Sequence, residues 1–428
     1  MSTPSSIEIP GKNKNERRAQ MNCKCKILVA SLLILVLLVP LWVGCGGQKK
    51  GVTIKIGEIT DLTGPASPAI IPLHWALQDM VRYYNEGGLI PGVKFNLVTW
   101  DDRYDPSREV PGYDWVRGRG AKMIVCVPPP TAVALKSFAD RDEFPICSLS
   151  THEAMLEPPG WVFCFSNSGY REMKTFLKWI HDVDWTDPQR IPKIGLVGWD
   201  EPNIHDYDSA LKEYASAHPD QIEYVGARIT PFGQIGWTAE VAALKNCDYI
   251  DAVGFPMGAF IKEFQSRGYR ARFFDMLTAS SYRGFLVDQL GWEALDGVLA
   301  VNMSLMWNEP VPVVDFAKTL LHRYHSKGEA DSAIYAGLAY VGGIQELMAF
   351  FQILETAIKA VGAENFNPQA FYDAAVQYKT EGPLWEGHPQ WSFSETKRYL
   401  ADHIAIYKFD ASVKDLVWVD GWIPLVTE

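Results

Sequence analysis

Short apolar stretches recur along the chain, and longer amphipathic stretches separate them. The first, VTIKIGEI at residues 52–59, alternates apolar and polar positions as a half-buried strand does. A turn at residues 61–65 follows it, and apolar residues then recur at helical spacing from about residue 72 to residue 85. Further strands are predicted at residues 93–100, 123–127, 145–149, 193–199, 222–228, 248–255, 270–274 and 297–303.

Helical patterns fill most of the intervals between these strands. They are predicted to begin near residues 106 and 131 and to span 170–182, 207–217, 238–245, 259–267, 282–290 and a helix-rich block at 313–360. Strands that alternate with helices in this way are typical of parallel sheets. Two strand-like runs, at 403–409 and 415–422, end the chain. Because about nine strands precede them, we expect an α/β protein with two parallel sheets.

A different pattern occupies the N-terminal end. Residues 27–43 are 17 uncharged residues, with six basic and two acidic residues before them and Gly44-Cys45-Gly46-Gly47 after them. A basic head, an apolar run and small residues are the parts of an export signal. The alternative is an uncleaved membrane anchor, because a spanning helix needs at least about 17 apolar residues. Pro40 and the glycines favour the signal, and Met21 is an alternative start that would leave residues 1–20 untranslated.

Both interpretations of the N-terminal end tether the rest of the chain to a membrane and place it outside the cytoplasm. The charge and composition of the chain then argue against two further classes of protein. The 428 residues carry a net charge of -11, and without residues 1–44 there remain 34 basic and 49 acidic side chains. This acidic balance argues against a nucleic-acid partner, because such proteins present basic surfaces. Apolar residues make up 47% of the chain, which suits a packed core and excludes a disordered protein.

Chemically active residues do not assemble into a catalytic motif. The sequence has no phosphate-binding loop, dinucleotide fingerprint, zinc-protease motif or nucleophile elbow. Asp101, Asp102 and Asp105 are near enough in sequence to be the paired carboxylates of a hydrolase. Their position between a strand and a helix start instead favours turn and capping roles. We therefore predict a protein that is not an enzyme, with no catalytic residues, metal or cofactor.

Three cysteines lie in or near neighbouring strand ends. Cys126, Cys147 and Cys164 are interpreted as small buried hydrophobic side chains, which is the usual environment of a free cysteine. A disulfide among these residues and Cys247 is the alternative, and the sequence leaves it open.

Hydroxyl side chains follow one of the predicted strands. Open α/β proteins capture ligands at the carboxyl ends of their strands, where helix N-termini favour an anionic group. Ser148, Ser150 and Thr151 lie at such an end, and their hydroxyls can both donate and accept hydrogen bonds. Ligand contact and plain capping of the next segment are equally compatible with this pattern.

Several longer stretches together resemble a known family. They are IKIGEITDLTGP at 54–65, GGLIPGVKFNLVTWDDRYDP at 87–106, the 20-residue spacing from Thr131 to Thr151, and TEGPL at 380–384. In this order and spacing they resemble the leucine/isoleucine/valine-binding branch of the type I periplasmic binding proteins, which serve ABC importers. The Val43-Gly44-Cys45 sequence is similar to a bacterial lipoprotein signal, in which Cys45 would be the lipid attachment site.

The resemblance implies two Rossmann-like lobes joined by three crossing strands, with a solute enclosed between them by hinge closure. Lobe 1 would comprise residues 52–168 and 304–379, and lobe 2 residues 169–303 and 380–428. Residues 1–44 would be the signal and residues 45–51 a spacer. The protein would be a monomer that delivers its solute unchanged to an ABC permease in the membrane. A ligand-binding sensor or regulatory protein of the same fold is the alternative.

The resemblance also places candidate ligand contacts. Leu149, Ser150 and Thr151 fall where the family cradles the carboxylate of an amino acid. Pro128 falls where the family has a serine, and the run of three prolines from Pro128 removes N–H donors. Phe255 falls near the aromatic residue that closes over the ligand from the second lobe.

One position departs from the family in charge. Leu277 falls near the carboxylate that pairs with the ammonium group of the amino acid. A buried ammonium group without a counter-charge is costly. We therefore expect a solute with less need for ammonium recognition, such as an aromatic or aliphatic carboxylic acid. Because Asp275 is near in sequence and can supply the missing charge, an ordinary amino acid is the other expectation.

Overall fold

The computed structural model describes residues 51–254, 256–276 and 278–426 of the chain. The predicted signal at residues 1–44, the lipid attachment site Cys45 and the spacer up to residue 50 lie outside the described residues, as do Phe255 and Leu277. The residues from Val52 onward form one unit by their contacts. Both sheets of the described residues belong to this unit.

Sheet A is the first of two sheets and consists of five parallel strands in the order β2-β1-β3-β4-β5. Four of the strands were predicted from apolar periodicity, and this prediction is confirmed. The fifth, β5, has three residues, too few to show a period, and was not predicted; β4 is equally short but lies within the predicted stretch at residues 145–149. The bounds are Val52–Thr60 for β1, Val93–Asp101 for β2, Ala121–Cys126 for β3, Ile146–Ser148 for β4 and Val162–Cys164 for β5.

Sheet B has seven strands in the order β12-β11-β10-β9-β8-β6-β7. Strands β6 to β10 are parallel, whereas β11 runs antiparallel to both β10 and β12. The sequence predicted parallel sheets, and sheet B is mixed because the short connection from β11 to β12 permits only a hairpin. The bounds are Lys193–Trp199 (β6), Glu223–Thr230 (β7), Tyr249–Val253 (β8), Arg272–Met276 (β9), Leu299–Asn302 (β10), His403–Asp410 (β11) and Asp415–Pro424 (β12).

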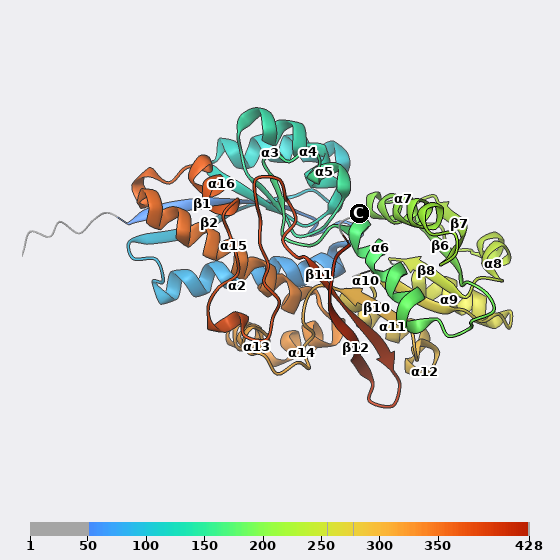
Figure 1. Cartoon of the computed structure of the whole chain (residues 1–428). Coiled ribbons are helices and arrows are strands. Elements are labelled where there is room, and N and C mark those ends of the chain that lie inside the picture. Colours follow the sequence, from blue (N-terminus) through green and yellow to red (C-terminus); the bar gives the residue numbers. More distant parts are fainter. Residues whose placement is uncertain (1–50, 255, 277, 427–428) are drawn as a thin grey trace, which may run out of the picture. The chain divides into compact units, whose positions relative to one another are not determined.

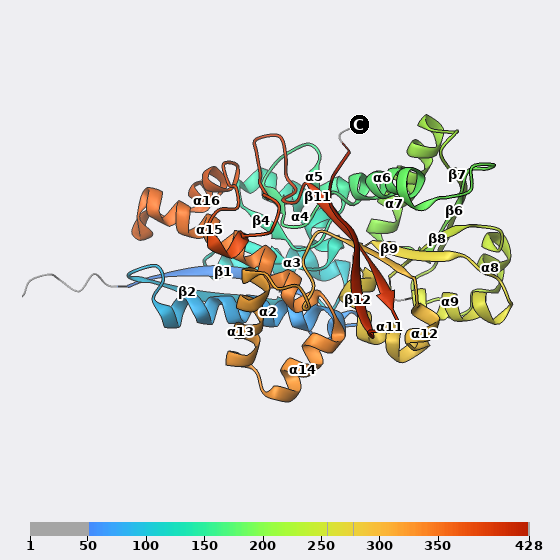
Figure 2. The same ribbon diagram turned by 60° about the horizontal axis from the view of Figure 1, so that its bottom comes forward.

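Helices cover the sheets, as Figures 1 and 2 show. In Figure 1, α2 and α15 run along one face of sheet A, and α3, α4 and α5 cover the other. The longer helices are α2 (Ser67–Gly87), α3 (Glu109–Gly118), α4 (Pro129–Asp142), α6 (Gly169–Trp179), α7 (Pro202–Ala217), α9 (Met257–Ser266), α11 (Arg283–Leu290), α13 (Pro312–Tyr324), α14 (Lys327–Ala336), α15 (Ala339–Val361) and α16 (Pro368–Ala375). Shorter ones are α5 (Glu153–Leu156), α8 (Thr238–Leu244), α10 (Thr278–Ser281) and α12 (Trp292–Leu295).

Helix α2 begins before the predicted start at residue 72. Pro68 lies in the first turn of this helix, where the backbone N–H groups have no partner within the helix. A proline at this position is therefore compatible with the helix. Further along the helix, Tyr84 stacks on Phe351 of α15 with ring centroids 4.5 Å apart. The apolar faces of α2 and α15 thereby form the core on this side of sheet A.

Helix α15 is the most apolar long helix of the described unit and is buried along most of its length. Among the described residues no single helix has the length and apolar composition to cross a membrane. Only α14 and α15 taken together meet that test, and they are bent by 90° to each other.

The segment between α16 and β11 packs against sheet A. Tyr399 pairs with Cys164 at the end of β5, and the Leu400 amide donates to the Ser166 carbonyl at 2.9 Å. The Phe393 ring lies 5.4 Å from the ring of Phe163. After α16, the chain returns to sheet B only at β11.

Candidate functional site

Two adjoining cavities lie where the strand ends of sheet A meet the loops that follow β6, β8 and β9 of sheet B. The larger cavity has a volume of about 540 Å³ and the smaller one about 140 Å³. They share part of their walls, including Tyr104, Glu201 and Tyr282. This position, at the carboxyl ends of parallel strands, is where open α/β folds bind ligands.

The smaller cavity is lined by those ligand-contact candidates from the sequence analysis that belong to the described residues. Pro128, Leu149, Ser150 and Thr151 all line it. Gly254 and Met276, the residues just before Phe255 and Leu277, also line it. The structure thus brings these positions together from both sheets, and their contact with a solute stays a prediction.

Local hydrogen bonds use part of the polar capacity of the smaller cavity. The Ser150 hydroxyl donates to the Val127 carbonyl at 2.6 Å, and the Thr151 hydroxyl accepts a long 3.4 Å bond from the Gly169 amide. Helix α4 starts at Pro129, and its first residues, Pro129 and Pro130, have no N–H to offer an anion. This helix start is therefore poorer in anion-binding donors than an ordinary one.

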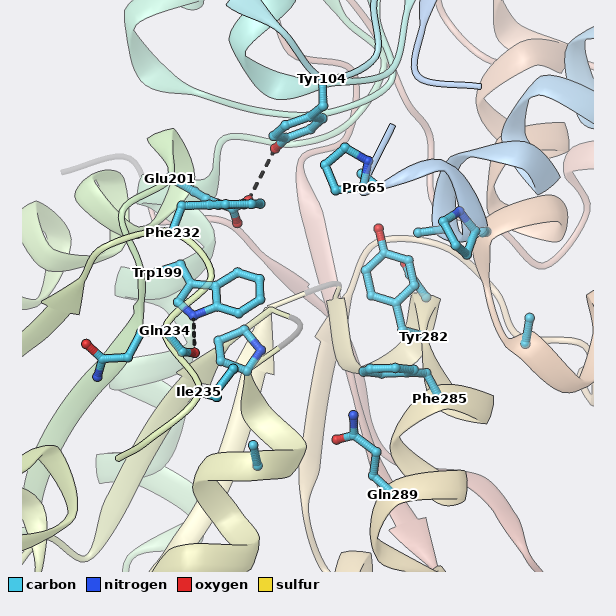
Figure 3. A pocket seen from close by; sticks show the side chains of 18 of the residues that line it. Pro65, Tyr104, Trp199, Glu201, Phe232, Gln234, Ile235, Tyr282, Phe285 and Gln289 are labelled. Atoms are coloured by element: carbon cyan, nitrogen blue, oxygen red, sulfur yellow. Dashed lines mark hydrogen bonds between the residues drawn. The ribbon is translucent and has the colours of Figure 1, made fainter. Parts of the chain in front are cut away.

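Aromatic and aliphatic side chains dominate the walls of the larger cavity (Figure 3). The Phe232 ring packs on Trp199 with centroids 4.9 Å apart and on Tyr104 at 6.3 Å. Across the open space lie Tyr282 and Phe285. The sequence did not reveal these residues, because single aromatic residues in loops, at the end of a strand (Trp199 in β6) or near the start of a helix (Phe285 in α11) carry no periodic signal.

Three large apolar side chains at this cavity are exposed to solvent. Phe232 is 49% exposed, Ile235 88% and Phe285 43%. These exposed apolar side chains lie around one cavity. Such a cluster indicates a surface that is covered by an apolar partner or by closure of a lobe.

Glu201 is the one charged side chain among the described residues that line the two cavities. It lies two residues after the end of β6, and its carboxylate accepts a 3.3 Å hydrogen bond from the Tyr104 hydroxyl. Burial raises the pKa of Glu201 above its ordinary value, and the Tyr104 bond opposes this only partly. Its place just after a buried strand is the signal that would have found it in the sequence.

Asp275, the alternative counter-charge from the sequence, is not part of either wall. It is fully buried, and its carboxylate accepts a 2.5 Å bond from the Ala279 amide at the start of the next helix. The carboxylate that reaches the cavities is therefore that of Glu201, which follows β6, and not that of Asp275 in β9, which the sequence indicated.

The acidic residues after β2 organise a turn. Asp101 accepts hydrogen bonds from the Leu62 amide at 2.9 Å and from the Thr63 hydroxyl at 2.5 Å. Asp102 accepts from the Tyr104 amide at 2.8 Å, and Asp105 caps the short helix that follows. Burial raises the pKa of Asp102 to about 6. The prediction of turn and capping roles is confirmed.

The four cysteines of the described residues are free and buried. Burial raises the pKa of the thiols of Cys126, Cys147, Cys164 and Cys247. The interpretation as small buried hydrophobic side chains is confirmed, and the disulfide alternative is wrong for these residues.

Two α/β sheets with an apolar cavity at their strand ends define a solute-binding protein of the two-lobed, type I kind. The chain belongs to the periplasmic binding protein family, whose sequence model matches residues 53–411. Since this is a family of binding proteins, the prediction of a protein that is not an enzyme is confirmed, and the family implies a location outside the cytoplasm. No curated protein sequence matches the chain.

Solved structures share the fold at low sequence identity. A branched-chain amino acid ABC transporter protein from Thermus thermophilus with bound valine has a TM-score of 0.72 and 17% identity, with 88% of this chain and 97% of that chain covered. A fatty acid ABC transporter substrate-binding protein from Thermomonospora curvata has a TM-score of 0.71 and 16% identity, with 87% and 95% covered. A solute-binding protein from R. palustris in complex with benzoate has a TM-score of 0.68 and 17% identity, with 88% and 98% covered. The type I periplasmic binding protein fold predicted from the sequence is confirmed.

Proposed function

We propose that this chain is the extracytoplasmic substrate-binding protein of an ABC importer of the branched-chain amino acid type. It captures a small solute between its two lobes and delivers the solute to a membrane permease. The observation that carries this proposal is the aromatic-rich cavity of about 540 Å³ between the strand ends of the two sheets. Among the described residues of its wall, no group is arranged for covalent chemistry. The proposed mechanism therefore consists of capture and release of the unchanged solute.

The proposed solute is an amino acid or an aromatic or aliphatic carboxylate. Its body would occupy the larger cavity, next to Trp199 and Phe232. Its polar end would face Ser150 and Thr151 in the smaller cavity. Proteins of this fold that bind valine, fatty acid and benzoate support this range of solutes.

For the two lobes we propose the predicted boundaries with one adjustment. We keep residues 52–168 and 304–379 for lobe 1, around sheet A, and residues 169–303 for lobe 2, around sheet B. The contacts of residues 393–400 with β5 favour a third crossing just before β11 rather than at residue 380. The protein would act as a monomer.

Filling the cavity is expected to abolish capture. Ser281 lines both cavities, and a Ser281→Trp substitution would place an indole ring in the space that the solute needs. Titrations with leucine, benzoate and octanoate, followed by calorimetry and by intrinsic tryptophan fluorescence, should show saturable binding of at least one solute by the wild-type protein. Ser281→Trp should weaken that binding at least about tenfold.

Ser209→Trp is the matched control, because Ser209 is exposed on α7 away from both cavities. It should bind like the wild-type protein. A folded wild-type protein that binds none of these solutes, and that releases no solute on denaturation, would contradict the proposed function.

Membrane tethering is expected to depend on Cys45. If Cys45 carries a lipid, Cys45→Ser removes the attachment site and should release the protein from membranes into the soluble fraction. The measurement is fractionation of cells that produce either form. Membrane retention of Cys45→Ser would instead support the uncleaved anchor at residues 27–43.

A further inference from the structure

The carboxylate of Glu201 is placed to act on a ligand. Glu201 occupies the N-cap position of α7, but its side chain makes no capping hydrogen bond to that helix. Among the described residues it accepts a hydrogen bond from the Tyr104 hydroxyl at 3.3 Å, and Tyr104 also belongs to the wall. No lysine, arginine or histidine lines either cavity among the described residues. Within these walls the carboxylate therefore meets no cation.

Aromatic rings surround the space next to this carboxylate. Figure 3 shows the Tyr104 hydroxyl directed at Glu201, with Trp199 and Phe232 on the same side of the cavity and Tyr282 facing them. The Trp199 indole N–H donates to the Gln234 carbonyl at 2.9 Å, which fixes the orientation of its ring. The negative faces of such rings attract cations, above all quaternary ammonium groups.

The charge of the solute decides how well it suits this wall. A carboxylate that approaches Glu201 meets a like charge in a poorly hydrated space, where repulsion is strong. An uncharged apolar solute would cover the carboxylate without neutralising it, which is also unfavourable. A cationic nitrogen would neutralise Glu201 and interact with the ring faces at the same time.

We propose that the cavity recognises a hydrophobic organic cation, an amine or quaternary ammonium group on an aromatic or aliphatic body, whose nitrogen pairs with Glu201 between the aromatic rings. This rests on the proposed capture-and-delivery function, and it replaces the carboxylate among the proposed solutes with a cation. Glu201 then supplies, from the end of β6, the counter-charge that the sequence resemblance places near Leu277.

The test uses two probes of similar size and opposite charge. Calorimetric titration should show that the wild-type protein binds benzyltrimethylammonium at least tenfold more tightly than 3-phenylpropionate. Glu201→Gln should weaken the binding of the cation at least tenfold and remove the preference between the probes. Asp200→Asn is the matched control, because Asp200 is the adjacent residue, is exposed and pairs with His205 at 2.7 Å. It should keep the preference.

The pH profile gives a second readout that a loss of folding would not mimic. Benzyltrimethylammonium keeps its charge at every pH, so its affinity should fall as pH decreases through the raised pKa of Glu201. Tyr104 and Tyr282 face Glu201, and burial raises the pKa of each above its ordinary value, so neither ionises in this range. The Asp200→Asn control reports any contribution of the Asp200–His205 pair.

Three outcomes would overturn the proposal. They are tighter binding of 3-phenylpropionate than of the cation, unchanged binding of the cation by Glu201→Gln, and an equal loss in Asp200→Asn. Saturable binding of 3-phenylpropionate or leucine alone would overturn this inference and leave the proposed solute-binding function standing. A folded protein that binds no probe and releases no solute on denaturation would overturn both.

Discussion

Replacing Gly337 with alanine is expected to lower the free energy of unfolding by about 2–4 kcal/mol and to weaken solute binding at least about tenfold. Gly337 joins α14 to α15 with a φ of 133°, a conformation that disfavours any residue with a Cβ atom. An added Cβ would overlap the main-chain oxygen of Ser280 and lie 3.0 Å from that of Ser281. Both are backbone atoms of α10, so no side-chain rotation relieves the clash.

The effect on binding follows from what this contact holds together. The Leu338 amide donates to the Ser280 carbonyl at 2.9 Å, which ties the start of α15 to α10. Ala339 on α15 and Ser281 at the end of α10 both line the two cavities. Strain at Gly337 would separate these walls. Chemical denaturation and solute titration of the same variant measure the two effects.

Gly328→Ala is the matched control for Gly337→Ala. Gly328 lies in the first turn of α14, and a Cβ there would meet no atom within 4 Å. This substitution should leave binding unchanged and leave the stability unchanged or raise it by up to about 1 kcal/mol. Equal stability and equal affinity of Gly337→Ala and the wild-type protein would show that α10 and α15 are not held in this contact.

Replacing Arg398 with alanine is expected to cost about 3–5 kcal/mol of stability. Arg398 is only 2% exposed and lies in the segment that packs against sheet A before β11. Its guanidinium group donates to the Gly160 carbonyl at 2.7 Å, to the Tyr372 hydroxyl at 2.6 Å and to the Ser394 carbonyl. It also lies 5.0 Å from the ring centroid of Phe163.

The substitution would leave these half-buried acceptors without donors and create a space beside the ring, and both consequences are destabilising. Arg398→Lys should recover part of the loss, because it keeps the charge but has one nitrogen for three separated acceptors. Arg270→Ala, at an exposed position, should change the stability by less than about 0.5 kcal/mol. Thermal and chemical unfolding curves measure the differences, and a loss for Arg398→Ala no larger than for Arg270→Ala would refute the role of this group.

Periodicity predicted the fold well because most strands of the two sheets are long enough to show it. The strand β1 and the segments around β2, β6 and β11 match their predicted ranges within a few residues. The strand β5 has three residues and α5 has four, so neither completes a recognisable period. The antiparallel pairing of β11 with β10 depends on where the chain returns from α16, which no local pattern encodes.

The candidate site was predicted in part. Pro128, Leu149, Ser150 and Thr151 do lie together at a cavity, because the carboxyl ends of neighbouring parallel strands meet at one sheet edge. Glu201 and the aromatic residues around it were missed. They come from loops and from the ends of strands and helices, whose positions depend on how the two sheets face each other, and each is an isolated polar or aromatic residue in the sequence.

The sequence by itself determined the α/β class, the order of most strands and helices, and the turn and capping roles of Asp102 and Asp105, and it favoured free, buried cysteines over a disulfide. The first three features follow from local periodicity and local hydrogen bonding, which a short stretch of residues specifies. The tertiary structure alone decided the character of the cavity, where the described residues place the Glu201 carboxylate among aromatic rings, and the packing of Arg398 and Gly337. Those features depend on contacts between residues tens to hundreds of positions apart, and such contacts exist only once the chain has folded.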